Sequence, residues 1–250
     1  MADDDYLDAV DYTRDDLDVD DLSDVKHAVK LQDVSRTFKI SGDEINAVNG
    51  VNFTVDANDF VVISGKSGSG KTTLLNIIGA IDLPTKGRVF VMDVPINDYD
   101  ESFRASFRLN NTGFIFQSYN LVSTLTAVEN VMFPMQLSPK KRDELRDDAL
   151  KLLESVELDH RADHLPWQLS SGEQQRIAIA RAMANDPPII LADEPTANLD
   201  GDSGQMIRDL LVKLNKNGKA VIVMTHDAGI ISQSGIRHYK MDNGVLTPHV

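Results

Sequence analysis

The chain has 250 residues, of which 42% are apolar and 26% charged, and it contains no cysteine. This composition is ordinary for a globular protein, and the lack of cysteine excludes disulfides and thiolate metal sites. The longest apolar stretch, residues 74–81, is interrupted by Asn76 and Gly79 and is far shorter than the ~20 residues of a membrane-spanning helix.

The formal net charge of −14 is concentrated at the amino terminus. Residues 1–25 hold eleven Asp and one Arg and carry −10, whereas the rest of the chain carries −4. The body has no excess of basic residues, which argues against a nucleic-acid partner. Segment 1–25 is predicted to be a disordered acidic tail, either a solvated extension or an interaction or autoinhibitory segment. It lacks the features of a signal peptide, which predicts a protein that stays in the cytosol.

The first predicted elements are strands. Residues 28–34 and 45–55 alternate between apolar and polar side chains, which predicts a small antiparallel layer. The run 60–64, FVVIS, is short and apolar and stands before a glycine, which is typical of a buried parallel strand. A helix is predicted over 71–81, where leucines and isoleucines recur on one face. Further strands are predicted over 87–92 and 112–116.

From about residue 121 to 169 the strand signals disappear. Leucines recur at helical spacing among charges, for example Leu145, Leu152 and Leu153, which predicts an inserted helical subdomain of two or three helices at about 118–170.

Strands and helices alternate again in the last third of the chain. The prediction is a helix over 172–185, a strand over 189–192, a helix over 201–214 and a strand over 220–224. Such alternation favours an α/β fold with a parallel sheet, in which the loops at the carboxyl ends of the strands form the site.

A glycine-rich loop follows the predicted strand 60–64. Segment 65–72, GKSGSGKT, fits the pattern G-x-x-x-x-G-K-[ST] at every fixed position. Glycines let successive N–H groups turn toward a phosphate, and the following helix directs its positive end at the same anion. A chance Gly/Ser loop is the alternative, and the position between strand and helix argues against it. The predicted nucleoside triphosphate site comprises Gly65, Lys66, Ser67, Gly68, Ser69, Gly70, Lys71 and Thr72.

Within this loop and the strand 189–192, four side chains have predicted chemical roles. Lys71 supplies a charge for the β- and γ-phosphates, and the Thr72 hydroxyl can bind Mg²⁺. Asp193 and Glu194 close the buried strand beside the loop. Asp193 can hold Mg²⁺, directly or through a water, and Glu194 can polarise an attacking water. An acidic strand terminus in a solvated turn is the alternative.

A second motif, LSSGEQQR at 169–176, lies 17 residues before Asp193. It resembles the LSGGQ signature of ABC ATPases, and further segments follow in that family's order. Gln117 resembles the Q-loop glutamine, Asp200 in Asn-Leu-Asp resembles the D-loop, and His226 resembles the switch histidine. Phe38 stands where the family places an aromatic that stacks on adenine, although a core aromatic is nearly as consistent with the sequence.

The resemblance covers about residues 28 to 248 and implies a P-loop NTPase core with an antiparallel layer and a helical insertion. It implies ATP hydrolysis with ATP and Mg²⁺ as cofactors. The implied catalytic residues are Glu194, His226, Lys71 and Gln117. The implied Mg²⁺ ligands are Thr72, Gln117 and Asp193. The nucleotide-contacting residues are, besides the loop, Phe38, Thr73, Ser170, Ser171, Gly172, Glu173 and Asp200.

Three departures from the family pattern stand out. Ser171 replaces a glycine, Glu173 replaces a glutamine and so places a negative charge near a bound anion, and Asn58-Asp59 replaces a Gly-Glu turn. The first two are expected to slow turnover without abolishing it.

The implied partners follow from where the nucleotide sites lie. Two copies would pair head to tail around two ATP, because each copy has its own phosphate loop and a second anion-binding helix terminus. Segments 74–79, 84–87 and 126–131 look like the exporters for lipoproteins and macrolides. This implies an integral-membrane permease partner with an extracytoplasmic domain, and a place at the inner face of the membrane. A soluble ABC ATPase without a permease is the alternative.

Overall fold

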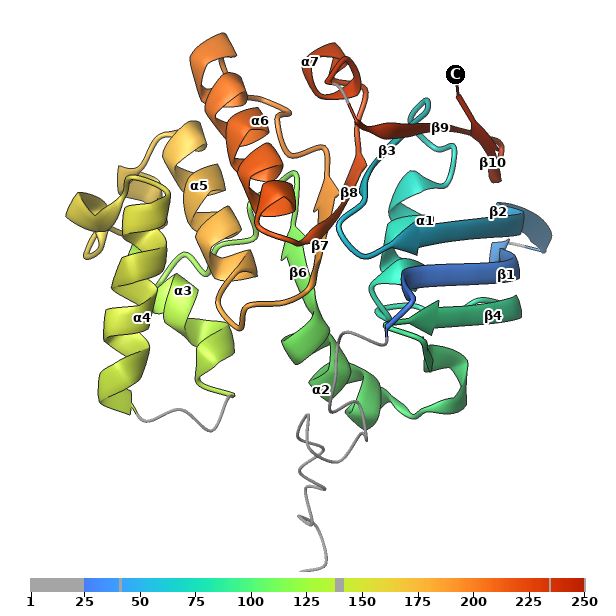
Figure 1. The fold of residues 1–250 in the computed structure, drawn as a ribbon, viewed down its shortest axis with the longest axis horizontal. Coiled ribbons are helices and arrows are strands. Elements are labelled where there is room, and N and C mark those ends of the chain that lie inside the picture. The colour runs from blue at the N-terminus through green and yellow to red at the C-terminus, as the bar shows by residue number, and fades with distance from the viewer. Residues whose placement is uncertain (1–24, 41, 138–141, 234, 250) are drawn as a thin grey trace, which may run out of the picture.

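The computed structural model describes residues 25–40, 42–137, 142–233 and 235–249, and these residues form two sheets (Figure 1). The smaller sheet has the order β2-β1-β4-β5 and is antiparallel. Its strands β1 and β2 contain the predicted segments 28–34 and 45–55 and extend beyond them, and β4 begins and ends one residue before the predicted segment 87–92. The bounds are β1 His27–Ile40, β2 Asp43–Asp56, β4 Lys86–Val91 and β5 Val94–Pro95.

The larger sheet has the order β10-β9-β3-β8-β7-β6. All of its strands run parallel to their neighbours except β10, which is antiparallel to β9. The carboxyl ends of the parallel strands therefore meet at one edge. The bounds are β3 Phe60–Ser64, β6 Thr112–Ile115, β7 Ile189–Asp193, β8 Ala220–Met224, β9 Arg237–Asp242 and β10 Val245–Pro248.

The helices cover the larger sheet on both faces, and Figure 1 shows α1 on one side of β7 and β8 and α5 on the other. The α-helices are α1 Lys71–Ile78, α2 Glu101–Asn111, α3 Ala127–Met135, α4 Arg142–Ser155, α5 Ser171–Ala182, α6 Gly201–Lys216 and α7 Ala228–Ile231. Short 3-10 helices are η2 Ile96–Asp98, η3 Asp159–Arg161 and η4 Pro166–Gln168. No helix in the described part of the chain is long and apolar enough to cross a membrane.

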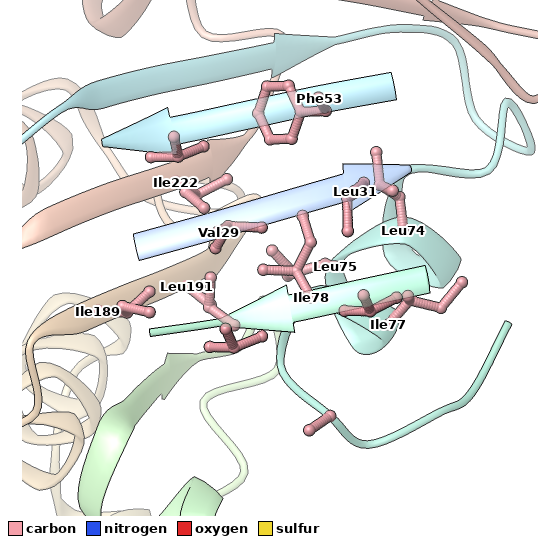
Figure 2. Close-up of a cluster of buried hydrophobic side chains, with 14 of the residues drawn as sticks. Val29, Leu31, Phe53, Leu74, Leu75, Ile77, Ile78, Ile189, Leu191 and Ile222 are labelled. Atoms are coloured by element: carbon pink, nitrogen blue, oxygen red, sulfur yellow. The ribbon is translucent and has the colours of Figure 1, made fainter. Parts of the chain in front are cut away.

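One hydrophobic core lies between α1, the antiparallel sheet and one face of the parallel sheet. Figure 2 shows Leu75 and Ile78 of α1 against Val29 of β1, with Leu191 of β7 and Ile222 of β8 beside them. Each of these side chains is at most 1% exposed, so the helix that follows the phosphate loop is anchored by burial of its apolar face.

A second core lies on the opposite face of the parallel sheet. The alternate residues of β7 and β8, such as Ile190 and Val221, join side chains of α3, α4, α5 and α6 there. Because successive strand residues point to opposite faces, the apolar runs of β7 and β8 supply both cores. Helices α1 and α5 are thereby fixed on opposite sides of one rigid sheet.

The structure differs from the sequence prediction at the end of α1 and in elements that were not predicted. α1 ends at Ile78 rather than at residue 81, because Gly79 caps it and Ala80 adopts a φ of 56°. α2, β9 and β10 lack a predicted counterpart. The predicted tail lies outside the described residues except for Val25, so it stays a prediction, as do the boundaries of the helical subdomain.

Candidate functional site

A cleft of about 830 Å³ opens at the carboxyl edge of the parallel sheet, beside the glycine-rich loop. The loop leaves β3 at Gly65 and enters α1 at Lys71, as predicted. Gly70 has a φ of 105°, and a Cβ there would lie 1.9 Å from the Ala47 carbonyl oxygen. Only glycine meets both conditions. The residues that line the cleft include Gly65, Lys66, Ser67, Gly68, Gly70, Lys71, Thr72 and Thr73.

The side chain of Lys71 is folded into the loop. Its Nζ donates to the Gly65 carbonyl at 2.7 Å and to the Lys66 carbonyl at 3.2 Å, and the residue is only 8% exposed. Ser69 Oγ, nearby in the loop, is buried and has no hydrogen-bond partner. The ammonium group of Lys71 at a helix amino terminus suits a phosphate ligand, whereas Ser69, although predicted to belong to the nucleotide site, does not line the cleft.

Two predicted metal ligands contact each other at the cleft. Thr72 Oγ1 donates to Asp193 Oδ2 at 2.8 Å. Burial raises the pKa of Asp193, and the charge of Glu194 also raises it, against the opposing effects of Thr72 and Lys71. A divalent cation would supply the missing countercharge. A hydroxyl and a carboxylate beside a phosphate site are the hard oxygen donors that Mg²⁺ prefers, so these residues fit Mg²⁺.

Glu194, which follows β7, has a strained backbone and a fixed carboxylate. Its φ is 44°, and its N–H donates to the Met224 carbonyl of β8 at 2.8 Å. Oε1 lies 3.1 Å from His226 Nδ1, and Oε2 accepts the Thr225 hydroxyl at 3.0 Å. Strain of this kind clusters at functional sites. The adjacent strands β7 and β8 thus bring together two predicted catalytic residues that are 32 positions apart.

Gln117 follows β6 and also lines the cleft, so all four predicted catalytic residues, Lys71, Gln117, Glu194 and His226, lie around one cavity. Three lining residues escaped prediction: Ala47 of β2, Ala197 after β7 and Lys240 of β9. No motif marks these positions. Lys240 reaches the cleft because β9 pairs in parallel with β3, which places another cation near the phosphate loop.

Phe38 lies in β1 and is not among the residues that line the cleft. The Arg36 guanidinium covers its ring, with the carbon atom Cζ 4.7 Å from the ring centroid. The predicted stacking on adenine therefore stays a prediction.

The signature residues form the amino terminus of α5 on the other face of the sheet, and they too do not line the cleft. Ser170 is the N-cap, and its hydroxyl accepts the Glu173 N–H at 3.2 Å. The Glu173 carboxylate accepts the Ser170 N–H at 2.8 Å and pairs with Arg161 Nε at 3.1 Å. Ser171 opens the helix. The charge of Glu173 is thus partly neutralised within its own chain.

The electrostatics of Glu173 follow from these contacts. Burial raises the pKa of Glu173, but its hydrogen bonds with Ser170 and the charge of Arg161 outweigh burial, so the pKa lies below its ordinary value. Gly172 packs against α6, since a Cβ there would lie 2.6 Å from Ser203 Oγ. Asp200 caps α6 by accepting the Ser203 N–H at 2.8 Å. Asp200 and the signature therefore lie next to each other, apart from the cleft.

The departure at Asn58-Asp59 has a structural explanation. Asn58 adopts a φ of 68°, a conformation that asparagine tolerates better than most residues with a side chain. Asp59 forms an ion pair with Arg237 of β9 and accepts the Asp56 N–H at 2.9 Å. The turn before β3 is therefore held without the Gly-Glu pair.

Comparison with known proteins agrees with this geometry. A model of the ABC transporter family matches residues 48–197. The chain is 47% identical over 207 residues to an uncharacterized ABC transporter ATP-binding protein of Methanocaldococcus jannaschii, MJ0796, covering 81% of this chain and 88% of that protein. It is 38% identical to the lipoprotein-releasing system ATP-binding protein LolD of Idiomarina loihiensis, over 87% of this chain and 96% of that protein.

Two further comparisons concern a longer relative and a solved structure. The chain is 44% identical to the macrolide export ATP-binding/permease protein MacB of Chlorobium phaeobacteroides, over 81% of this chain but only 31% of that protein. It superimposes on a dimeric post-hydrolysis structure of the MJ0796 cassette bound to ADP and Pi with a TM-score of 0.82. That match has 43% identity and covers 88% of this chain and 98% of the other.

Proposed function

Because this chain belongs to the ABC transporter family, whose ATP-binding members are ATPases, we propose that it hydrolyses ATP as one of two identical subunits. The two copies pair head to tail around two MgATP and drive a membrane permease. Its relatives include both a lipoprotein-releasing ATP-binding protein and a macrolide exporter, which supports an exporter of this group.

The observation that carries the pairing is the placement of α1 and α5. The core residues of α1 pack on one face of the parallel sheet and those of α5 on the other. The predicted metal and catalytic residues line the cleft at α1, whereas no residue of the α5 amino terminus lines it. One phosphate cannot contact both termini of the same copy, since the sheet separates them. A twofold pair puts each α5 terminus over its partner's nucleotide.

In each cleft the residues would divide the work. The loop N–H groups and Lys71 would hold the phosphates, and Thr72, Asp193 and Gln117 would hold Mg²⁺, which would supply positive charge to neutralise the developing negative charge of the phosphates. Glu194 orients the attacking water and accepts its proton. His226, whose ring is 80% exposed, donates a hydrogen bond to the γ-phosphate.

The remaining contacts come from both copies. Phe38 and Thr73 complete the nucleotide site of one copy. The partner copy contributes the nucleotide contacts of Ser170, Ser171, Gly172, Glu173 and Asp200.

The test of the pairing uses the absence of cysteine from the sequence. Ser67→Cys and Ser171→Cys are introduced together with Glu194→Gln, which preserves bound ATP, and a short thiol crosslinker is added with and without MgATP. We expect a covalent dimer that forms with MgATP. Each single-cysteine variant is the matched control and should crosslink far less, because Ser67 of one copy faces Ser171 of the other. Dimers indifferent to nucleotide would contradict the pairing.

The permease partner is supported by an apolar groove of about 600 Å³ between α2, α3, β6 and α5. Ile81, Phe133 and Leu137 line it and are 43%, 53% and 71% exposed. Large exposed apolar side chains that converge in one groove mark a protein-binding site, and a groove of this kind suits an amphipathic helix.

We assign the groove to a short helix of the permease, which places the protein at the inner face of the membrane. By resemblance the permease carries an extracytoplasmic domain. Co-purification from membranes tests this assignment. A protein that copurifies with no permease would favour the soluble ABC ATPase instead.

A further inference from the structure

Thr225 contacts the carboxylate of Glu194 and directly precedes His226 in the chain, and it has no assigned role. It follows β8, and its side chain and backbone are fully buried. Its N–H donates to the Ile63 carbonyl of β3 at 3.1 Å, so the residue is held between two central strands of the parallel sheet. A buried hydroxyl at this position must have a hydrogen-bond partner inside the protein.

That partner is the carboxylate of Glu194. Thr225 Oγ1 donates to Oε2 at 3.0 Å, while His226 Nδ1 lies 3.1 Å from Oε1. The two contacts differ in burial, because Thr225 is 0% exposed and the His226 side chain is 80% exposed. His226 is free to turn toward a phosphate, whereas Thr225 is not free to leave Glu194. The Thr225 contact is therefore the permanent one.

The direction of the hydroxyl proton is set by a third residue. The Asp227 N–H donates to Thr225 Oγ1 at 3.0 Å, which occupies the acceptor side of the oxygen and leaves its single proton for Glu194. Asp227 itself is anchored, since its Oδ2 accepts Arg208 Nη1 at 2.9 Å and the Thr196 hydroxyl at 2.7 Å. The segment 225–227 is thus a rigid support for the carboxylate.

We infer that Thr225 is a positioning residue for ATP hydrolysis: it holds Oε2 of Glu194 so that Oε1 is presented to the attacking water. The inference rests on the proposed role of Glu194 as the base. Glu194 needs such a support because its backbone is strained and its side chain is only 15% exposed. Without the Thr225 hydroxyl, the buried Oε2 would lose its hydrogen-bond donor, and the carboxylate would rotate toward water.

The test compares Thr225→Val, which removes the hydroxyl at nearly constant shape, with Thr225→Ser, which keeps it. We expect T225V to lower kcat about 10- to 100-fold, the scale of a small misplacement of a catalytic group, with the KM for ATP changed less than about twofold. T225S should stay within about threefold of the unchanged protein. A merely structural role would move both variants, or would change KM and the thermal midpoint together.

Two further proteins separate the possible failures. Thr112→Val, which removes a buried hydroxyl that donates to the Arg108 carbonyl, is the matched control and should keep full kcat. Glu194→Gln should lose at least ~100-fold in hydrolysis, and adding T225V to it should cost nothing more. If E194Q hydrolyses normally, the base assignment itself is wrong.

If E194Q is impaired but T225V binds and hydrolyses MgATP like the unchanged protein, only the role of Thr225 is wrong. Should T225V fail to fold, Thr225→Ala against T225S gives the same contrast, and equal kcat for the two overturns the inference.

Discussion

The amino termini of α1 and α5 are both predicted to bind phosphate, yet their first turns are built differently. α1 begins after Gly70, has no side-chain cap and carries no acidic residue in its first turn. α5 begins after Ser170, which forms a reciprocal capping box with Glu173. The first N–H groups of a helix carry the positive end of its dipole. At α1 the side chains leave these groups to the ligand, whereas at α5 they satisfy one N–H and add a negative charge.

The difference indicates an order of events. α1, with Lys71 folded over the loop, is expected to bind a phosphate in the isolated chain. α5 already has one first-turn N–H bonded to a side chain and carries an acidic residue there, so it is expected to gain less from an anion and to act second, when a partner copy presents its nucleotide. A strong site at α1 followed by a weaker one at α5 would let nucleotide bind first and then control the proposed pairing.

Removing the positive charge of Lys71 at the amino terminus of α1, the strong terminus, should have the largest effect. Lys71→Ala is expected to weaken ATP binding by about 2–4 kcal/mol, roughly 30- to 1000-fold, because ground-state phosphates lose a buried countercharge. Titration with ATP and Mg²⁺ measures it. Lys86→Ala on β4, an exposed lysine that does not line the cleft, is the control and should bind normally. An unchanged dissociation constant for K71A would mean that the loop N–H groups suffice.

Much of this fold was predictable because its central strands are short apolar runs. β3 and β8 have the predicted bounds, and the glycine-rich loop stands between β3 and α1. β9 escaped prediction because its sequence, RHYKMD, is mostly polar and lacks an apolar run. α2 was also missed, although Asp100 caps it and Phe103 and Phe107 are spaced one turn apart and buried, which is a recognisable helix signal.

The functional site was also predictable only in part. Lys71, Gln117, Glu194 and His226 are found from motifs and do share one cleft. The contact of Glu194 with Thr225 was beyond sequence reasoning, because it depends on the pairing of β7 with β8 and on the positive φ of Glu194. Pairing register and backbone strain of this kind arise from tertiary packing, which local sequence patterns do not encode.

An intermediate effect is expected from removing the N-cap at the amino terminus of α5, the weak terminus. Ser170→Ala should lower the free energy of unfolding by about 1 kcal/mol, as loss of an N-cap does, and should reduce MgATP-dependent crosslinking several-fold, while the free chain binds ATP normally. Thr126→Ala is a closely matched control, since Thr126 forms the same capping box with Glu129 in α3. It should cost similar stability and leave crosslinking intact.

One outcome of this substitution would contradict the proposed difference between the amino termini of α1 and α5. If S170A weakened ATP binding to the isolated chain as K71A does, both helices would serve one phosphate. The separation of α1 and α5 by the sheet would then have no functional meaning.

The smallest effect should come from the charge at the weak terminus. Glu173→Gln keeps the capping box, since glutamine also suits that position, but removes a negative charge from the first turn. The α5 terminus then attracts an anion better, by about 0.3–1 kcal/mol, so the MgATP-dependent dimer should tighten about two- to fivefold. Analytical ultracentrifugation in the Glu194→Gln background measures it. Glu129→Gln at the matching position of α3 should leave the dimer unchanged.

The pH dependence of stability gives a second readout of the same charge. Burial opposes the charge of Glu173, but its contacts with Ser170 and Arg161 prevail and hold its pKa below the ordinary 4.5. A carboxylate with a lowered folded-state pKa adds stability above its unfolded pKa and loses it as the pH falls through the folded value. The stability difference between the unchanged protein and E173Q should thus be constant above about pH 5.5 and shrink below about pH 4.5. Denaturant unfolding between about pH 3 and 7 measures it, and a difference that grows toward low pH would show that Glu173 is not held in its charged form.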